Sequence, residues 1–505
     1  MPTEFHTGKH PHLFQINTWV WLDQLSRAGG RTMHLADVPD SEWDRLKALG
    51  FDLVYLLGIW KRSLAGRRIF RTDPANFGGF DHALPGWTIS NVVGSPFSIQ
   101  DYVPDAHIGD WKQVDAVRRK LHDRGMGLIL DFVPNHTGPD HVWIDSHPEY
   151  YVQGTEADYH AHPAAFILVE PEQGSPTFIA RGRDPYFDPW TDTAQLNYFS
   201  PAAREALIGV LRHISEYCDG VRCDMAMLML NDIFPRTWGN LLRGTATPKR
   251  EFWEEAIAAV RAGFIWMAEV YWDLEARLQQ LGFNYTYDKR LYDRLREQSG
   301  QSVRDHLSAD INYQTRMARF LENHDEPRSV PTYGRQRIPS LAGMVSTLPG
   351  LRFFHQGQFE GRTLHIPMPL NAVQQEGADN ELAKVYEKIL AIANDRVFHD
   401  GDWRLLPVES SGGDSSCDNL VAYRWKTGDT FRVVVVNLSG ATSQGRIHVE
   451  QELPAASKYV FADRFNGPEY LWQRADLLSG GLYVKLDPYG LHIFEVSAAE
   501  SAGRG

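Results

Sequence analysis

The chain contains few cysteines and no long apolar run. Its 505 residues include only Cys218, Cys223 and Cys417, an odd and small number that excludes the disulfide framework of a small secreted domain. No hydrophobic stretch approaches the roughly 20 residues of a membrane-spanning helix, so we predict no membrane partner. The N-terminal segment MPTEFHTGKHPHLFQINTW has no apolar stretch of signal-peptide length, which favours a cytoplasmic location.

Basic residues are scarce relative to acidic ones. Lys and Arg number 51 against 64 Asp and Glu, which gives a formal net charge of −13. Because nucleic-acid binding requires a basic patch, this balance argues against a nucleic-acid partner. The hydrophobic content of 43% is ordinary for a soluble globular protein. The length allows one large domain with one or two smaller ones.

The most informative feature is a series of short apolar runs that each end in an acidic residue. They read GLILD at 127–131, continuing through FVPNH to 136, GVRCD at 220–224, FIWMAE at 264–269 and RFLENHD at 319–325. Such runs are typical of strands buried on both faces. Polar residues at the carboxyl ends of parallel strands meet where α/β folds place their ligand. Because unpaired buried carboxylates are costly, several acids converging there indicate a functional site.

These four segments, in this order and spacing, resemble the four signature regions of the α-amylase family of retaining glycoside hydrolases. The resemblance covers roughly residues 10–495. It implies an α/β fold, a TIM (β/α)8 barrel with an inserted domain B after strand 3 and a C-terminal antiparallel β-sandwich domain. The expected boundaries are 1–137 and 199–398 for the catalytic barrel (domain A), 138–198 for domain B, 399–497 for domain C and 498–505 for a disordered tail.

The remaining patterns are consistent with this organisation. Apolar strand patterns alternate with amphipathic stretches and so predict βα units; the strands are expected at 12–22, 52–60, 127–134, 220–227, 264–271, 283–287, 317–322 and 351–356. Segment 138–198, rich in Pro, Gly, His and Asp, interrupts the alternation, and a connection of this length is usually functional. After about residue 398, short alternating strands with Gly, Asp and Pro at the turns predict a small antiparallel domain.

The resemblance also assigns the chemistry. It makes Asp224 the nucleophile, Glu269 the general acid/base and Asp325 a third acid that stabilises the transition state. Retaining cleavage of an acetal needs a carboxylate at the anomeric carbon and a carboxylic acid at the leaving oxygen, about 5–5.5 Å apart. Arg222 lies two residues before Asp224, on the same strand face, and we expect it to lower the pKa of Asp224. The apolar neighbours of Glu269 are expected to raise its pKa, as a proton donor requires.

Further residues resemble substrate-binding positions of the family. His136 and His324 resemble two histidines that bond sugar hydroxyls. In GSPFSIQDY at 94–102, Phe97 occupies the place of a stacking tyrosine, four residues before Asp101. A phenyl ring still stacks on a sugar but lacks the hydroxyl.

Two departures from the family limit the substrate assignment. Arg328, in NHDEPR, resembles an arginine with which exo-acting α-glucosidases hold the non-reducing end, but its usual aspartate partner is replaced by Gly94. The Lys-His pair that many amylases carry after the nucleophile is absent, so recognition on the leaving-group side should differ. Polar residues at the end of strand 8 are equally compatible with binding sugar hydroxyls and with tying loops together; they are Gln356, Gln358, Glu360 and Arg362.

No essential metal is expected. Asp131 resembles an aspartate of the barrel's polar network, and Asn135 resembles an asparagine that either ligates calcium or braces the loop; the structural role is preferred. The family's calcium set includes a histidine shortly after the nucleophile, where this chain has apolar residues. The loop residues His160 and His162 alone do not make a metal site. Ca²⁺ as a structural ion stays open.

The sequence therefore predicts a glycoside hydrolase that cleaves α-glucosidic bonds of an α-glucan, an oligosaccharide or a small glucoside by a retaining double displacement. The alternative within the family is a transglycosylase or a disaccharide isomerase of the trehalose synthase kind, because hydrolysis and transfer share their first half. A non-catalytic glucan-binding member would typically lose one of the three acids. A metal-dependent hydrolase would need a cluster of His and carboxylate ligands at the strand ends, and the sequence lacks that pattern.

Overall fold

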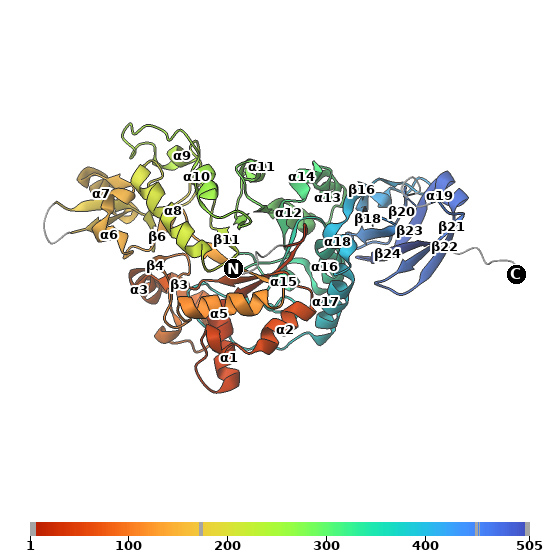
Figure 1. The fold of residues 1–505 in the computed structure, drawn as a ribbon, viewed down its shortest axis with the longest axis horizontal. Helices are drawn as coiled ribbons and strands as arrows, with labels where there is room; N and C mark the ends of the chain where they lie inside the picture. The colour runs from red at the N-terminus through yellow and green to blue at the C-terminus, as the bar shows by residue number, and fades with distance from the viewer. Residues whose placement is uncertain (1–6, 171–174, 450–452, 454, 500–505) are drawn as a thin grey trace.

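A closed barrel of parallel strands forms the centre of the molecule (Figure 1). The computed structural model describes residues 7–170, 175–449, 453 and 455–499. In these residues the barrel has the spatial order β1-β15-β14-β13-β12-β11-β5-β2. Its eight strands are β1 (His12–Asn17), β2 (Leu53–Leu57), β5 (Gly127–Phe132), β11 (Gly220–Cys223), β12 (Ile265–Ala268), β13 (Tyr285–Tyr287), β14 (Met317–Arg319) and β15 (Leu351–His355). The predicted fold class is confirmed.

The strands form where the sequence has short apolar runs, and every residue of β2, β5 and β11 is buried. The predicted range 12–22 is wrong at its end. The side chain of Asn17 accepts a hydrogen bond from the backbone N–H of Val20 and so caps helix α1 (Thr18–Gly29). Five residues that looked like a continuing strand are therefore the first turns of that helix.

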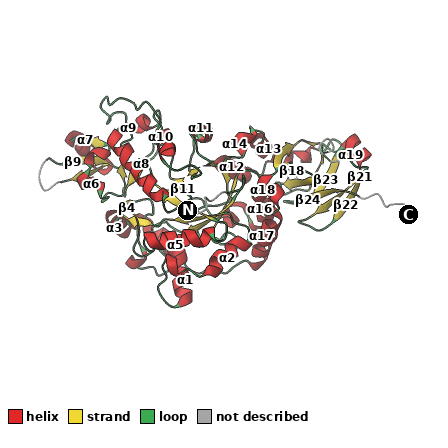
Figure 2. Cartoon of the chain, in the orientation of Figure 1, coloured by secondary structure: helices red, strands yellow, loops and turns green. Residues whose placement is uncertain are grey.

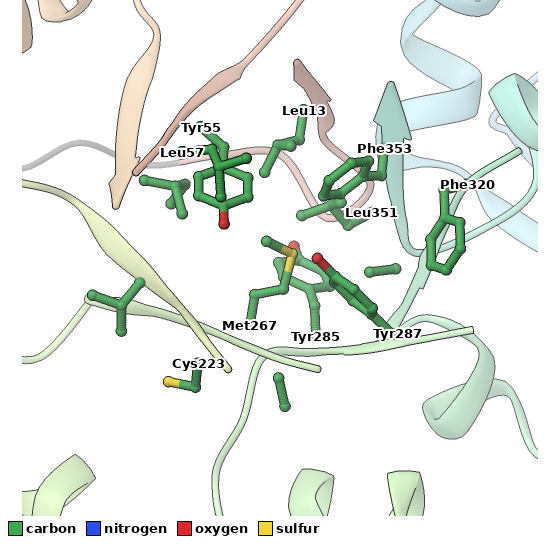
Figure 3. Packing of buried hydrophobic residues seen from close by; sticks show 14 of the residues in the cluster. Leu13, Tyr55, Leu57, Cys223, Met267, Tyr285, Tyr287, Phe320, Leu351 and Phe353 are labelled. Atoms are coloured by element: carbon green, nitrogen blue, oxygen red, sulfur yellow. The ribbon is translucent and has the colours of Figure 1, made fainter. Parts of the chain in front are cut away.

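Large side chains fill the barrel interior (Figure 3). The ring of Phe353 lies between Tyr55 and Tyr287, with ring centroids 6.4 and 5.9 Å away respectively. Figure 3 shows both phenol oxygens directed into the barrel, where Met267 also packs. These side chains are buried, so the barrel interior is a packed core, and the site is expected at the C-terminal ends of the strands.

Helices surround the barrel and lie in the connections between its strands (Figure 2). Besides α1, those that follow or precede barrel strands are α2 (Asp40–Ala48), α5 (Trp111–His122), α8 (Pro201–Ser215), α9 (Phe234–Trp238), α10 (Phe252–Ala259), α11 (Glu275–Gln280), α12 (Lys289–Glu297), α13 (Gly300–Leu307), α14 (Ile311–Gln314), α15 (Ser329–Tyr333), α16 (Ile338–Thr347), α17 (Asn380–Ala393) and α18 (Arg396–Asp400). No helix within the described ranges combines the length and the apolarity that crossing a membrane requires.

Two insertions stand on the C-terminal side of the barrel. After β2, strands β3 (Trp60–Arg62) and β4 (Ile99–Pro104) pair, with α3 (Leu64–Thr72) and α4 (Phe77–Ala83) between them. After β5, the strands β6 (His136–Thr137) and β10 (Ala194–Gln195) pair and enclose a second insertion. Its other elements are α6 (Trp143–Ser146), β7 (Gln153–Gly154), α7 (Glu156–Ala161), β8 (Phe166–Val169) and β9 (Thr177–Ala180).

The C-terminal part is a sandwich of two antiparallel sheets around its own apolar core. The larger sheet contains β16 (Asp402–Leu406), β18 (Leu420–Thr427), β19 (Thr430–Asn437), β24 (Leu491–Ala498), β21 (Lys458–Asp463) and β22 (Glu469–Gln473). The smaller contains β17 (Val408–Glu409), β20 (Ser443–Ile447) and β23 (Leu482–Leu486), and helix α19 (Arg474–Gly480) precedes β23. Ala498 ends β24, which corrects the predicted tail at that residue; 500–505 lie outside the described residues.

Candidate active site

The predicted acids lie together at the C-terminal ends of the barrel strands. Asp224 directly follows β11 and Glu269 directly follows β12, and their backbone N–H groups continue the barrel ladder by donating to the carbonyls of Phe132 and Cys223. Asp325 lies in the loop after β14. The register of these strands, which the apolar runs set, therefore brings the three carboxylates to one face.

A single buried guanidinium connects the three acids. Nη1 of Arg222 lies 2.6 Å from Oδ1 of Asp224, and Nη2 lies 2.8 Å from Oε2 of Glu269 and 3.5 Å from Oδ2 of Asp325. The Arg222 side chain is 0% exposed, so its guanidinium makes these contacts without access to water. One cation facing three carboxylates leaves an excess of negative charge, which is suited to a positively charged transition state.

The three carboxyl groups differ in their acidity. Burial raises the pKa of Asp224 even though Arg222 opposes this, so the expected low pKa is wrong. Burial and the neighbouring Asp224 raise the pKa of Glu269 to about 7 against the opposing charge of Arg222. Desolvation opposes ionisation of Asp325, but the charges of His324, Arg222 and His365 together outweigh it and lower the pKa of Asp325 to about 2. Glu269 is therefore the group best able to carry a proton near neutral pH.

His324 and Phe97 lie next to the acids, whereas the contacts of His136 are with Asn135 and Trp190. Nε2 of His324 lies 3.0 Å from Oδ2 of Asp325, and its Nδ1 lies 2.7 Å from Nε2 of Gln15. The ring of Phe97 lies 5.4 Å from that of His324 and 5.4 Å from the Arg222 guanidinium carbon. His136 is buried in β6, and burial lowers its pKa to about 4, so it is neutral at physiological pH.

Asp131 and Asn135 support the scaffold. The carboxylate of Asp131 accepts hydrogen bonds from the hydroxyl of Tyr55 and, at 2.5 Å, from the backbone N–H of Gly58. Asn135 accepts two hydrogen bonds from the side chain of Gln195, at 2.8 and 3.2 Å, and so fastens the base of the inserted domain. These contacts account for the structural role that the sequence favoured.

The contacts of Arg328 and the strand pairing of Asp101 are with residues other than the three acids. Arg328 is 4% exposed; it pairs with Glu322 at 2.6 Å and donates to the carbonyls of Leu364 and Gln356. Asp101 lies in β4 opposite Lys61, and no hydrogen bond or ion pair found in the described ranges joins it to the three acids. The contacts of Arg328 favour a structural role, whereas the substrate-binding role of Asp101 stays a prediction.

The glutamines after β15 connect loops. The side-chain oxygen of Gln356 accepts from the backbone N–H of Asn17, and its amide donates to Gln24. Gln358 is buried and donates to the hydroxyl of Tyr386 at 3.0 Å. Of the two roles left open for these residues, the contacts favour tying loops together.

Two hydrogen-bond partners of Glu269 were not predicted from the sequence. The hydroxyl of Tyr271 donates to Oε1 of Glu269 at 2.8 Å, and the backbone N–H of Met225 donates to Oε2 at 2.8 Å. Met225 has a φ of 43°, a strained conformation for a residue other than glycine. The sequence offers only one indication of the Tyr271 contact. Tyr271 follows Glu269 at position i+2, and extended backbone directs the side chains of residues i and i+2 to the same side.

A cavity lined by aromatic and charged residues adjoins these residues. Tyr186 and Phe187, at the tip of the inserted domain, are 68% and 69% exposed, and the carboxylate of Asp184 holds their turn by accepting from both backbone N–H groups. Tyr186 contacts Trp272 edge to face at 5.1 Å. Phe187 and Trp272 line a cavity of about 440 Å³ together with Met225, Tyr271 and Lys289, among others. No periodic pattern in the sequence predicts this contact.

The described residues contain no group of three or more His, Cys, Asp or Glu side chains arranged to hold a metal ion. The expectation that activity needs no metal stays a prediction. The three cysteines are buried, and burial raises the pKa of the Cys223 thiol well above its usual range, which keeps this neighbour of Asp224 unreactive.

Comparison with known proteins agrees with this geometry. Residues 41–403 match the family model "Alpha amylase, catalytic domain". The chain is 24% identical over 420 residues to alpha-amylase MalA of Haloarcula japonica, covering 81% of this chain and 53% of MalA. It is also 24% identical over 488 residues to alpha-1,4-glucan:maltose-1-phosphate maltosyltransferase 2 of Streptomyces coelicolor, covering 90% and 64% of the two chains. This chain thus spans about half to two thirds of these relatives' lengths.

A solved structure, the maltogenic alpha-amylase AmyB of Thermotoga neapolitana, superposes with a TM-score of 0.67 at 20% identity, covering 97% of this chain and 99% of that one. At this identity the likeness concerns the fold. The family model covers well over half of the chain and includes all three acids and Arg222. The chain belongs to the α-amylase family.

Proposed function

We propose that this protein is a glycoside hydrolase that cleaves α-glucosidic bonds of an oligosaccharide, an α-glucan or a small glucoside with retention of anomeric configuration. The observation that carries the proposal is the bridge of Arg222 to Asp224 and Glu269 at 2.6 and 2.8 Å. One guanidinium holding both carboxylates keeps them close together. Retaining catalysis needs such closeness, because one group must attack while the other protonates.

Each acid has a role that fits its surroundings. Asp224 attacks the anomeric carbon while the proton of Glu269 passes to the leaving oxygen, giving a glycosyl ester on Asp224 and a free leaving sugar. Glu269, now a carboxylate, takes a proton from the incoming water as that water attacks the same carbon and releases Asp224. Asp325, whose pKa the charges of His324, Arg222 and His365 together lower to about 2, stays ionised and stabilises the positive charge of the transition state.

The acceptor of the second step separates the hydrolase from its alternative. A transglycosylase of the same mechanism would pass the glycosyl unit to a sugar hydroxyl in place of water. Two observations support keeping this alternative: the likeness to a maltosyltransferase, and the cavity beside Glu269 lined by Phe187 and Trp272. Exposed aromatic faces suit stacking on a sugar ring, which would hold an acceptor sugar at the site.

Product analysis over time tests the proposal. Maltose, maltoheptaose, sucrose, trehalose and isomaltose are supplied separately. Shorter products with free glucose support the hydrolase and separate endo from exo action. Longer or rearranged sugars support the transglycosylase or isomerase, and inertness towards all five, matched by Asp224→Asn, would count against catalysis on common α-glucosides.

A further inference from the structure

The carboxyl group of Glu269 has two unequal oxygens. Oε2 accepts from the backbone N–H of Met225 and faces Nη2 of Arg222, both at 2.8 Å. Oε1 has one hydrogen-bond partner among the described residues, the hydroxyl of Tyr271 at 2.8 Å. A proton on Oε2 would point at two groups that also carry hydrogens. The transferable proton therefore belongs on Oε1, beside Tyr271.

Tyr271 is suited to serve both protonation states of the acid. A phenol hydroxyl donates one hydrogen bond and accepts others, so it accepts from Oε1–H when Glu269 is protonated and donates to Oε1 when Glu269 is ionised. Burial, followed by the charges of Glu269 and Asp325, raises the pKa of Tyr271 well above its usual value. The phenol itself therefore keeps its proton throughout the reaction.

The location of Tyr271 connects this role to the leaving group. Its side chain lines the cavity of about 440 Å³ that Met225, Phe187 and Trp272 also line. Because Tyr271 and Met225 both line this cavity and both hydrogen-bond to Glu269, the cavity adjoins the acid/base, and we assign the leaving or accepting sugar to it. Bonded to Oε1, the Tyr271 hydroxyl fixes the direction in which Oε1 presents its proton.

We propose that Tyr271 is the positioning residue of the acid/base, which holds the transferable proton on Oε1 of Glu269 and directs it to the leaving oxygen. In the first half-reaction the Oε1 proton turns from the Tyr271 hydroxyl to the leaving oxygen and passes to it as the bond of that oxygen to the anomeric carbon breaks. The Tyr271 hydroxyl then donates to the new carboxylate. In the second half, Oε1 takes the proton of the acceptor as the bond to Asp224 breaks. Tyr271 exchanges no proton overall. This inference rests on the proposed function.

Two substrates distinguish the loss of proton positioning from a general loss of active-site structure. In maltose the leaving group is a sugar hydroxyl, which must be protonated to depart. In α-D-glucosyl fluoride the leaving group is fluoride ion, which departs without being protonated. Tyr271→Phe should lower kcat/KM for maltose about 10–100-fold, the range of general acid catalysis, and change kcat/KM for the fluoride less than about twofold. Tyr271→Gln, whose amide can donate to Oε1, should recover part of the loss. An equal loss on both substrates would overturn the inference.

Tyr198→Phe is the matched control. Tyr198 is 1% exposed, and its hydroxyl donates to the carbonyl of Pro134 at 2.6 Å. Removing that hydroxyl deletes one buried hydrogen bond without touching Glu269. It should leave the ratio of the two kcat/KM values unchanged.

An infrared titration of the Glu269 carboxyl tests the inference without turnover. The band is assigned by its loss in Glu269→Gln. The hydroxyl bonds both forms of the carboxyl, but its bond to the ionised form is the stronger. Tyr271→Phe should therefore raise the midpoint by about 0.5–1 pH unit. An unchanged midpoint in a folded variant would overturn the inference. Wild-type inactivity on both substrates would instead refute the proposed function and leave this titration to decide on Tyr271.

Discussion

Removing the guanidinium of Arg222 should destabilise the fold in a pH-dependent way. In Arg222→Met the long side chain is kept, but Asp224 and Glu269, whose side chains are 10% and 6% exposed, lose their shared cation. Breaking a buried ion pair by deleting one partner costs about 3–5 kcal/mol. The contact to Asp325, at 3.5 Å and with a carboxylate 38% exposed, adds little because solvent screens it.

The sign of the pH dependence follows from the carboxyl groups. Burial already raises the pKa of Asp224 and of Glu269 in the folded protein, and without Arg222 both should rise further. A carboxyl whose folded pKa exceeds its unfolded value costs stability above the unfolded pKa, and the cost grows until the pH passes the folded pKa. The loss in free energy of unfolding of Arg222→Met relative to wild type should therefore be larger at pH 8 than at pH 5.

Urea titrations of wild type and Arg222→Met at these two pH values give the free energies of unfolding. Arg204→Met is the control: Arg204 is 5% exposed and pairs at 2.7 Å with Glu255, whose side chain is 33% exposed and can return to water. Arg204→Met should lower the free energy of unfolding by about 1 kcal/mol, equally at both pH values. An Arg222→Met deficit that is below about 1 kcal/mol, or the same at pH 5 and pH 8, would refute the reasoning.

Three further outcomes are expected. Because burial and Asp224 raise the pKa of Glu269 to about 7 and the acid must be protonated, kcat/KM should fall as pH rises through about 7; a pH profile that stays flat to about pH 9 would contradict this. Phe97→Tyr restores a hydroxyl near His324 and should lower KM about threefold, whereas unchanged kinetics would remove Phe97 from the substrate contacts. EDTA should leave activity within about twofold of the untreated enzyme, and loss that added Ca²⁺ restores would show that an ion is needed.

Much of the barrel and the acid cluster could be predicted from the sequence, because short apolar runs ending in acids encode both the strands and the place where they end. Asn17 shows the limit, since one capping side chain turned a continuous apolar pattern into a strand and a helix. The low pKa expected for Asp224 was wrong because the strand pattern shows that Arg222 lies close to Asp224, whereas the degree to which Asp224 is buried is a property of the folded protein.

Contacts between distant segments were beyond the sequence. Tyr186 meets Trp272 only because the tip of the inserted domain lies over the loop after β12. Arg328 looked available to a substrate, but the fold directs its guanidinium to Glu322 and to two carbonyls. Tertiary geometry of this kind has no periodic signature in the chain.

The central claim is that Asp224 becomes covalently glycosylated, and trapping tests it most directly. The protein is incubated with 5-fluoro-α-D-glucosyl fluoride, a reagent whose glycosyl-enzyme turns over slowly, and the digested peptides are analysed by mass spectrometry. We expect one fluoroglucosyl unit on the peptide that contains Asp224, located on that side chain and absent in Asp224→Asn. A label on another residue, or turnover of the reagent with inversion and no label, would contradict the account.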